Sequence, residues 1–270
     1  MSAKLPFSDP ISEAALAVEA ITKASKAVLE TYGEEFTSDL KDDDSPITKA
    51  DLQSNEIIKK VLYASGLPIL SEEDKDDKSR INHEKIWIVD PLDGTSDFVN
   101  KTGEFTVMIG LVKHKRPILG LISRPTTNTL FLAQSGEGAY KFENNSWQKL
   151  SVSKTSDIRK CRAVGSRFHL SEEERRFFKE LGVLSFESRG SSLKVAEISM
   201  GLADLYLTSS NKIKHWDTCA SHCLVTEAGG KMTDMLGNEI SYNTERINHE
   251  NGLLVTNGLV HDEIIRRYAS

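Results

Sequence analysis

Apolar residues in the first part of the chain recur at the spacing of amphipathic helices. In residues 11–32, apolar side chains stand three or four positions apart, which predicts a helix with one face toward a core. Residues 49–64 show the same spacing and predict a second helix. Both segments carry many charged residues, so they are expected to lie on the surface of a globular core rather than in a membrane.

Shorter apolar runs follow in the middle of the chain and are typical of β-strands. The runs at residues 105–112 and 118–123 are separated by a turn at residues 113–117, and further runs occur at residues 129–133 and near residues 138–140. Neighbouring strands joined by short turns pair in antiparallel order. This region therefore predicts an antiparallel sheet.

The last part of the chain shows a different pattern, in which strands and helices alternate. The predicted strands lie near residues 162–164 and 183–185, and the predicted helices cover residues 171–181, 191–200 and 217–228. We place the boundary between the two patterns near residue 150. Residues 1–150 then form an N-terminal α+β subdomain that carries the metal motif, and residues 151–270 form a C-terminal α/β subdomain that carries Asp217 and the substrate pocket.

Composition narrows the class of protein. The 270 residues contain 34 Lys and Arg against 40 Asp and Glu, a net charge of −6, so a protein that binds nucleic acid without specificity is not expected. No apolar run has the length of a membrane span, and the first residues lack the apolar core of a signal peptide, which predicts a soluble, cytoplasmic protein. Three cysteines are too few for a disulfide framework and are expected to be reduced thiols.

Two aspartates directly after an apolar strand give the clearest chemical signal. Asp90 and Asp93 can direct oxygen ligands at Mg²⁺, and the carbonyl of Leu92 between them is a further candidate ligand. The next residues, Gly94 and Thr95, together with Ser96, are predicted to open a short helix whose backbone amides favour an anion. The segment therefore predicts a metal ion beside a bound phosphate.

Two other acidic positions are candidates for the same site. Glu72 and Glu73 follow the apolar strand at residues 68–71, and Asp217 follows Trp216 at a predicted helix start. Taken alone, a strand-end acid is commonly solvated and an acid at a helix start is commonly a cap. Together with Asp90 and Asp93, they favour a metal site.

The order of these motifs resembles the lithium-sensitive, magnesium-dependent phosphatase superfamily that includes inositol monophosphatases and fructose-1,6-bisphosphatases. That pattern is an acidic pair after a strand, then Asp-Pro-(Ile/Leu)-Asp-Gly-Thr, then Trp-Asp downstream, and the similarity extends from Pro46 to Gly230. The resemblance implies an α/β fold, a layered αβαβα sandwich, with the active site between its two halves.

Within the superfamily, the chain is most similar to 3′(2′),5′-bisphosphate nucleotidases of the CysQ type. The similarity lies in Gly-Glu-Phe-Thr-Val at residues 103–107, Gly-Ser-Ser-Leu-Lys at residues 190–194 and, in a shorter match, Ser-Arg-Phe-His at residues 166–169. It implies hydrolysis of the 3′-phosphate of adenosine 3′,5′-bisphosphate (PAP) to AMP and phosphate, extending to its 5′-phosphosulfate analogue PAPS, in sulfur metabolism.

The resemblance also implies a role for each acidic residue. Glu72, Asp90 and the Leu92 carbonyl would hold the Mg²⁺ ion that activates the attacking water. Asp90, Asp93 and Asp217 would hold a second Mg²⁺ ion near the leaving oxygen. Asp217 would also contact the substrate.

Thr95 and its neighbours would handle the water. The hydroxyl of Thr95, hydrogen-bonded toward Glu72, would orient and help to deprotonate it, while the amides of Gly94 and Thr95 hold phosphate oxygens. Asp51 and Thr48 resemble a Thr-x-x-Asp element that supports the water or a third Mg²⁺ ion. Asp51 also fits an ordinary acid in the first turn of a helix.

A second group of residues is expected to bind the 5′-phosphate. The turn at residues 190–192 offers backbone amides and hydroxyls at a helix start, and a lysine follows; an ordinary serine cap with an exposed lysine fits the same sequence. Arg167 and His169 are candidates for this pocket. The full set expected here is Gly190, Ser191, Ser192, Lys194, Arg167 and His169.

Several alternatives stay open. His215, Cys219, His222 and Cys223 could offer soft zinc ligands along one helix, although the apolar context favours core packing. An inositol-1-phosphate phosphatase of the same fold would keep every metal ligand, whereas a non-catalytic phosphonucleotide-binding or sensing protein should have lost one. The acidic run at residues 41–44 predicts a solvated loop near the site, and a homodimer is left open.

Overall fold

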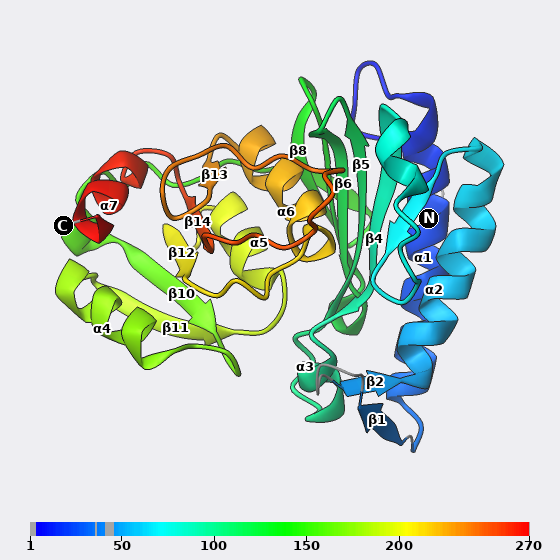
Figure 1. Ribbon diagram of the computed structural model, residues 1–270, viewed down its shortest axis with the longest axis horizontal. Coiled ribbons are helices and arrows are strands. Elements are labelled where there is room, and N and C mark those ends of the chain that lie inside the picture. The colour runs from blue at the N-terminus through cyan, green and yellow to red at the C-terminus, as the bar shows by residue number, and fades with distance from the viewer. Residues whose placement is uncertain (1–3, 36, 41–45, 270) are drawn as a thin grey trace.

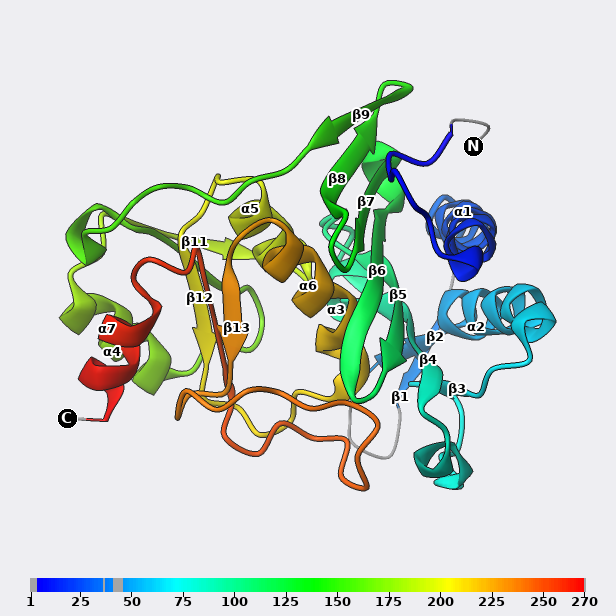
Figure 2. The same ribbon diagram turned by 90° about the horizontal axis from the view of Figure 1, so that it is seen from above.

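The structure is a computed structural model that describes residues 4–35, 37–40 and 46–269. The acidic run at residues 41–44 lies outside these residues. Five layers succeed one another: two helices, a seven-stranded sheet, two helices, a five-stranded sheet and two further helices (Figure 2). The predicted αβαβα sandwich is confirmed. In the described part of the chain, no helix is long and apolar enough to cross a membrane.

The seven-stranded sheet forms the centre of the first half. Its strands in spatial order are β3 (Ile69–Ser71), β4 (Lys85–Asp93), β5 (Thr106–Lys113), β6 (Arg116–Arg124), β7 (Thr129–Gln134), β8 (Gly138–Glu143) and β9 (Ser146–Lys149). β3 runs parallel to β4, and the other neighbours are antiparallel. The predicted antiparallel strands are confirmed, whereas the short, polar β9 has no apolar alternation and escaped prediction.

Two helices cover the outer face of this sheet, as Figure 1 shows. They are α1 (Ser12–Tyr32) and α2 (Lys49–Leu62), close to the predicted ranges. The buried face of α1 consists largely of alanines, whose small side chains allow it to approach α2 and the sheet. A small antiparallel pair, β1 (Ser38–Leu40) and β2 (Pro46–Thr48), precedes α2.

The five-stranded sheet belongs to the second half. Its spatial order is β11 (Ser185–Arg189), β10 (Arg162–Ser166), β12 (Leu205–Thr208), β14 (Leu253–Thr256) and β13 (Lys231–Thr233). β10 is parallel to both of its neighbours, and the other pairs are antiparallel. The strand predicted at residues 183–185 begins only at Ser185, and Leu184 is 67% exposed.

Four helices flank this sheet. The outer pair is α4 (Glu172–Leu181) and α7 (His261–Tyr268), and the inner pair is α5 (Leu193–Ser199) and α6 (His215–Glu227). α5 begins later than predicted because Ser191 adopts a left-handed φ of 48°, which interrupts the helical backbone. α7 was not predicted.

α6 packs closely on the seven-stranded sheet, although it belongs to the second half. A Cβ atom at Gly110 would lie 2.4 Å from the sulfur of Cys219, and one at Gly120 would lie 2.4 Å from the carbonyl oxygen of Ala220. Glycine is therefore required at both positions for this approach. The shared helix joins the two halves tightly, so the division into subdomains near residue 150 stays a prediction.

Candidate active site

Three carboxylates from three elements meet between the two halves. The parallel pairing of β3 and β4 places Ser71 opposite Val89, so Glu72, which follows β3, lies beside Asp90. Asp217 arrives from the first turn of α6. Carboxylate oxygens of Glu72, Asp90 and Asp217 lie within 4.8 Å of one another. Hard oxygen donors gathered in this way suit Mg²⁺.

The electrostatics of this acid cluster favour a cation. Burial, and then the negative charge of Glu72, raise the pKa of Asp217 well above its ordinary value. Burial also raises the pKa of Asp93, although Lys194 and the amide of Ser192 oppose the rise. A divalent cation would relieve the repulsion among these carboxylates, so the residues present fit a metal ion.

Asp93 lies at the border of the cluster and faces the second half. Its Oδ2 accepts a hydrogen bond from the backbone amide of Ser192 at 2.6 Å and another from the Thr106 hydroxyl at 3.2 Å. Asp90 Oδ1 accepts the amide of Leu92 at 3.1 Å, which fixes the turn between the two aspartates. Asp93 therefore bridges the halves, and its role as a metal ligand stays a proposal.

The predicted short helix is α3 (Thr95–Val99), and it begins beside the cluster. Gly94 precedes it with a left-handed φ of 88°. A Cβ atom at Gly94 would lie 3.0 Å from Cβ of Ser191, so the two halves approach closely here. The amides of Thr95 and Ser96 open the helix next to the acid cluster, as the sequence predicted.

The partner of the Thr95 hydroxyl differs from the one expected. Thr95 Oγ1 donates to Asp51 Oδ1 at 3.1 Å and lies 3.2 Å from the carbonyl oxygen of Leu92, so the expectation of a bond toward Glu72 was wrong. Asp51 Oδ2 in turn accepts the amide of Thr48 at 2.8 Å and its hydroxyl at 2.6 Å. Asp51 thus caps α2 and also contacts Thr95, while its role toward the attacking water or a third Mg²⁺ ion stays a prediction.

The turn at residues 190–192 uses its amides in a way that was not predicted. The amide of Gly190 donates to Glu104 Oε2 at 2.7 Å, and that of Ser192 donates to Asp93. Since protein carboxylates take both amides, the prediction that they bind a phosphate was wrong. The Ser191 hydroxyl, in contrast, is buried and has no hydrogen-bond partner among the residues that the structure describes.

Lys194 is buried and lies beside this turn. Its side chain is embedded, with 8% of the residue exposed, and Nζ donates to the carbonyl oxygen of Ser191 at 2.6 Å. The alternative of an ordinary exposed lysine was therefore wrong. Burial lowers the pKa of Lys194, and the neighbouring carboxylates, Asp93 foremost, oppose that change.

Comparison with known proteins decides the family. The model of the inositol monophosphatase family matches residues 9–269. The chain belongs to this family. It is 35% identical over 224 residues to the 3′(2′),5′-bisphosphate nucleotidase CysQ of Escherichia coli strain K12, covering 81% of this chain and 89% of that protein. Membership of this family and these relatives indicate that the chain is a phosphatase.

Solved structures agree with this assignment. The crystal structure of CysQ from Bacteroides thetaiotaomicron, a bacterial member of the inositol monophosphatase family, aligns with a TM-score of 0.78 at 33% identity, covering 91% of this chain and 97% of that one. An IMPase from Thermotoga maritima aligns with a TM-score of 0.80 at 23% identity, over 94% and 96% of the two chains, and shows the shared fold.

Arg167 and His169 both lie near the turn at residues 190–192. Arg167 Nη2 contacts Glu104 Oε2 at 2.6 Å, and its Nε lies 3.3 Å from Asp97 Oδ1. Burial and then the charge of Lys194 lower the pKa of His169. Sequence reasoning assigned no role to Asp97 or Glu104. The signal that could have pointed to Glu104 is its place in the Gly-Glu-Phe-Thr-Val motif at residues 103–107.

The zinc alternative finds no geometric support. Within the residues that the structure describes, Glu72, Asp90 and Asp217 are the one set of three metal-capable side chains close enough to share an ion. Cys219 and Cys223 are buried, and burial raises the pKa of both thiols. Core packing, the interpretation favoured by the sequence, accounts for them.

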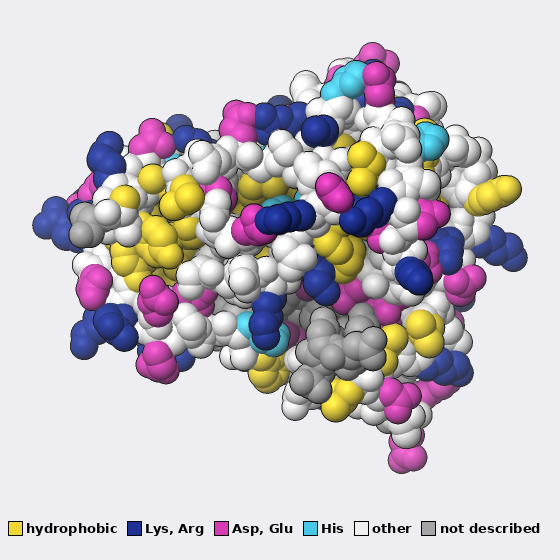
Figure 3. Space-filling view, in the orientation of Figure 1, with side chains coloured by type: hydrophobic (Ala, Val, Ile, Leu, Met, Phe, Trp, Pro, Cys, Tyr) yellow, Lys and Arg dark blue, Asp and Glu magenta, His cyan; other side chains and the backbone are white. Residues whose placement is uncertain are grey.

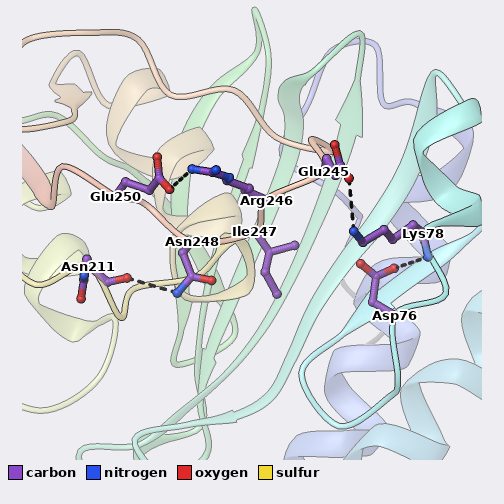
Figure 4. A pocket seen from close by; sticks show the side chains of 8 residues that line it. All are labelled: Asp76, Lys78, Asn211, Glu245, Arg246, Ile247, Asn248 and Glu250. Carbon is purple, nitrogen blue, oxygen red and sulfur yellow. Dashed lines mark hydrogen bonds and ion pairs between the residues drawn. The ribbon is translucent and has the colours of Figure 1, made fainter.

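A separate surface pocket of about 470 Å³ lies beside the start of α6 (Figure 4). Its charged side chains are engaged in ion pairs: Lys78 lies 3.3 Å from Glu245, Arg246 pairs with Glu250, and Asp76 pairs with Arg80 behind the pocket wall. Figure 3 shows that acidic and basic side chains alternate over this face without a region of one sign. No residue of the acid cluster lines the pocket, and we assign it no role in the reaction.

Proposed function

We propose that this phosphatase removes the 3′-phosphate of PAP, yielding AMP and phosphate, in a reaction that depends on Mg²⁺ and is inhibited by Li⁺. The observation that carries the proposal is the convergence of Glu72, Asp90 and Asp217 within 4.8 Å, beside a turn that presents a buried lysine. The similarity to CysQ relatives supports the choice of a bisphosphate nucleotide. We extend the proposal to PAPS, which carries the same 3′-phosphate.

Glu72, Asp90 and Asp217 would hold Mg²⁺, with Asp93 and the Leu92 carbonyl at the edge of the site. When bound, Mg²⁺ supplies positive charge to phosphate oxygens and lowers the pKa of a coordinated water. The proposal includes two such ions, with a third as a further option near Asp51. The backbone amide of Ser192 binds Asp93 Oδ2 and so fixes the orientation of this carboxylate. The other oxygen of Asp93, Oδ1, is then the one that would bind a cation.

The residues around Thr95 would direct the attacking water. The Thr95 hydroxyl donates a hydrogen bond to Asp51 Oδ1, so Thr95 Oγ1 can accept a hydrogen bond from the attacking water. Asp51 can then receive a proton through Thr95 Oγ1, while Thr48 fixes the orientation of Asp51. The amides of Gly94, Thr95 and Ser96 would hold oxygens of the phosphate that is cleaved.

The second phosphate of the substrate would lie at the turn of residues 190–192. Lys194 supplies a positive charge there, and the buried Ser191 hydroxyl offers a donor that no other described residue accepts. Arg167 and His169 border the same place. A substrate with two phosphates would use both ends of this site, whereas inositol 1-phosphate would use only the metal end.

The test compares phosphate release from PAP and from inositol 1-phosphate, with Mg²⁺ and then with added Li⁺. A higher kcat/KM for PAP, inhibition by Li⁺ and no turnover without Mg²⁺ would support the proposal. A preference for inositol 1-phosphate would replace the nucleotidase assignment by the inositol phosphatase alternative. Binding of PAP without turnover of either compound would favour the non-catalytic alternative.

A further inference from the structure

Glu104 lies in the first half, between α3 and β5, and its side chain reaches into the second half. Its Oε2 accepts two hydrogen bonds from that half, from Arg167 Nη2 at 2.6 Å and from the amide of Gly190 at 2.7 Å. Burial alone would raise the pKa of the Glu104 carboxyl, but these two bonds, together with the charges of Arg167 and Arg189, outweigh it and lower the pKa. An ionised carboxylate therefore joins the halves at this point.

Asp97, in α3, strengthens the same contact. Its Oδ1 accepts the Thr102 hydroxyl at 2.6 Å and lies 3.3 Å from Arg167 Nε. A Cβ atom at Gly190 would lie 2.5 Å from Asp97 Oδ2 and 2.6 Å from the Glu104 carbonyl oxygen. The turn thus sits directly on Asp97 and Glu104, without room for a side chain at position 190.

Between these contacts stands one residue in an unfavourable conformation. Ser191 has φ of 48°, which costs energy for a residue with a side chain and persists only where its neighbours hold it. The amide before it is held by Glu104, and the amide after it is held by Asp93. The two carboxylates therefore fix Ser191 from both sides, and the Ser191 carbonyl in turn accepts Lys194 Nζ.

We propose that Glu104 is a positioning residue for the second phosphate of the substrate, which it serves by holding Ser191 and Lys194 in place. This inference rests on the proposed function, because it gives Glu104 a role only for substrates with two phosphates. The carboxylate itself does not touch the phosphate. Its two bonds orient the donors on the turn that do.

The experiment measures kcat and KM for Glu104→Ala and Glu104→Gln with two substrates, PAP and adenosine 3′-monophosphate, which lacks the 5′-phosphate. Loss of the charge-assisted hydrogen bonds should raise the KM for PAP about tenfold in the alanine variant. Glutamine keeps an oxygen acceptor without the charge, so its KM should lie between those of alanine and the parent. The kcat for PAP should change by less than about threefold, and the KM for the monophosphate by less than about twofold.

Glu187→Ala is the matched control. Glu187 also pairs with an arginine on the second half, Arg189, but does not contact the turn at residues 190–192 through any hydrogen bond that the described residues show. Its KM for both substrates should equal that of the parent. A thermal unfolding curve for each variant identifies any loss of folded protein before the kinetics are compared.

Three results would overturn the inference. The first is an equal rise of KM for both substrates, which would mark Glu104 as a purely structural residue. The second is an unchanged KM for PAP, and the third is a lower KM for PAP, which would mean that Glu104 keeps Arg167 away from the phosphate. A parent protein that does not hydrolyse PAP would overturn the proposed function, and the inference with it. The parent and variant measurements therefore separate the two failures.

Discussion

Two polar junctions in this molecule use opposite chemistry: one joins the two halves, and the other joins α6 to the loop before β14 within the second half. Beside α3, the junction is ionic: Glu104 and Asp97 face Arg167. Beside α6, the junction is neutral: the Tyr242 hydroxyl donates to Thr218 Oγ1 at 3.1 Å, with one histidine on each side of this pair. The ionic junction lies next to the place proposed for a substrate anion. The neutral junction supports the helix that carries Asp217, a proposed metal ligand.

The neutral junction is neutral because it is buried. His249 Nε2 lies 2.7 Å from Thr218 Oγ1, and His222 Nδ1 lies 3.1 Å from the Tyr242 hydroxyl. Burial lowers the pKa of each histidine to about 4, so both are uncharged at neutral pH. The comparison teaches that buried, uncharged groups position α6, whereas ionised groups orient the turn at residues 190–192.

The largest effect should come from removing the centre of the neutral junction. Tyr242 is completely buried, so Tyr242→Ala should lower the free energy of unfolding by about 3–5 kcal/mol. Tyr242→Phe keeps the ring and should cost only about 1 kcal/mol, because only the hydrogen bonds to Thr218 and His222 are lost. Urea unfolding of the two variants measures both values. A similar loss in each would show that the hydroxyl, not the packing, carries this junction.

Acid should act on the neutral junction before it acts on the ionic one. Since the folded pKa of His222 and of His249 is about 4, below the ordinary 6.5, the unfolded chain binds more protons than the folded one between these values. Stability should therefore fall as the pH is lowered from 6.5 to about 4, by on the order of 3 kcal/mol for each histidine. The lowered pKa of Glu104 means that its contribution is lost only below about pH 4.5.

The measurement is the free energy of unfolding at pH 7, 5.5 and 4.5 for the parent, His249→Asn and His222→Asn. Each variant should show a shallower fall with pH than the parent. The control is His114→Asn, because the His114 side chain is 61% exposed. If this control flattened the curve equally, the buried histidines would not account for the acid sensitivity.

A smaller loss of stability, with a distinct loss of activity, should follow from displacing α6 on the sheet. In Gly110→Ala the new methyl group meets the Cys219 sulfur, so stability should fall by about 1–3 kcal/mol. Asp217 moves with the helix, and kcat should fall about a hundredfold. Gly33→Ala is the control, since its added carbon would make only an ordinary contact, 3.5 Å from the Glu30 carbonyl. If kcat stayed unchanged in the destabilised variant, the packing of α6 on the sheet would not control the position of Asp217.

The smallest effect concerns the ion pair itself. A double-mutant cycle of Glu104→Gln and Arg167→Met should give a coupling free energy of about 1 kcal/mol in unfolding experiments. The value is modest because a third of the Arg167 side chain is exposed, and it should decrease in 1 M KCl. Additive effects of the two substitutions would mean that the ionic junction contributes no pairwise stability.

The sequence was informative wherever one segment carries a whole chemical unit. Asp90, Asp93 and the helix start at Thr95 lie within six residues, so strand, turn and helix could be predicted together. Partners from distant segments could not be chosen in this way. The Thr95 hydroxyl finds Asp51 rather than Glu72 because the starts of α2 and α3 converge only in the folded chain.

The second half was predicted less completely for a related reason. β12, β13 and β14 contain only three or four residues each, too few for a period of two to stand out. The use of turn amides by Glu104 and Asp93 was also invisible, because a serine-rich turn before a helix looks the same whether its amides meet a ligand or the protein. Only the packing of one half on the other distinguishes these cases.

The position of α6 also affects how the protein is made on the ribosome. The last strand of the seven-stranded sheet ends at Lys149, but the inner face of that sheet, including Met108, Ile122 and Phe131, is covered by α6, which ends at Glu227. At a synthesis rate of about 5–20 residues per second, α6 is completed roughly 4–16 s after the last strand of the sheet. During that interval the apolar face of the sheet is exposed on the nascent chain, and we expect a chaperone to bind it.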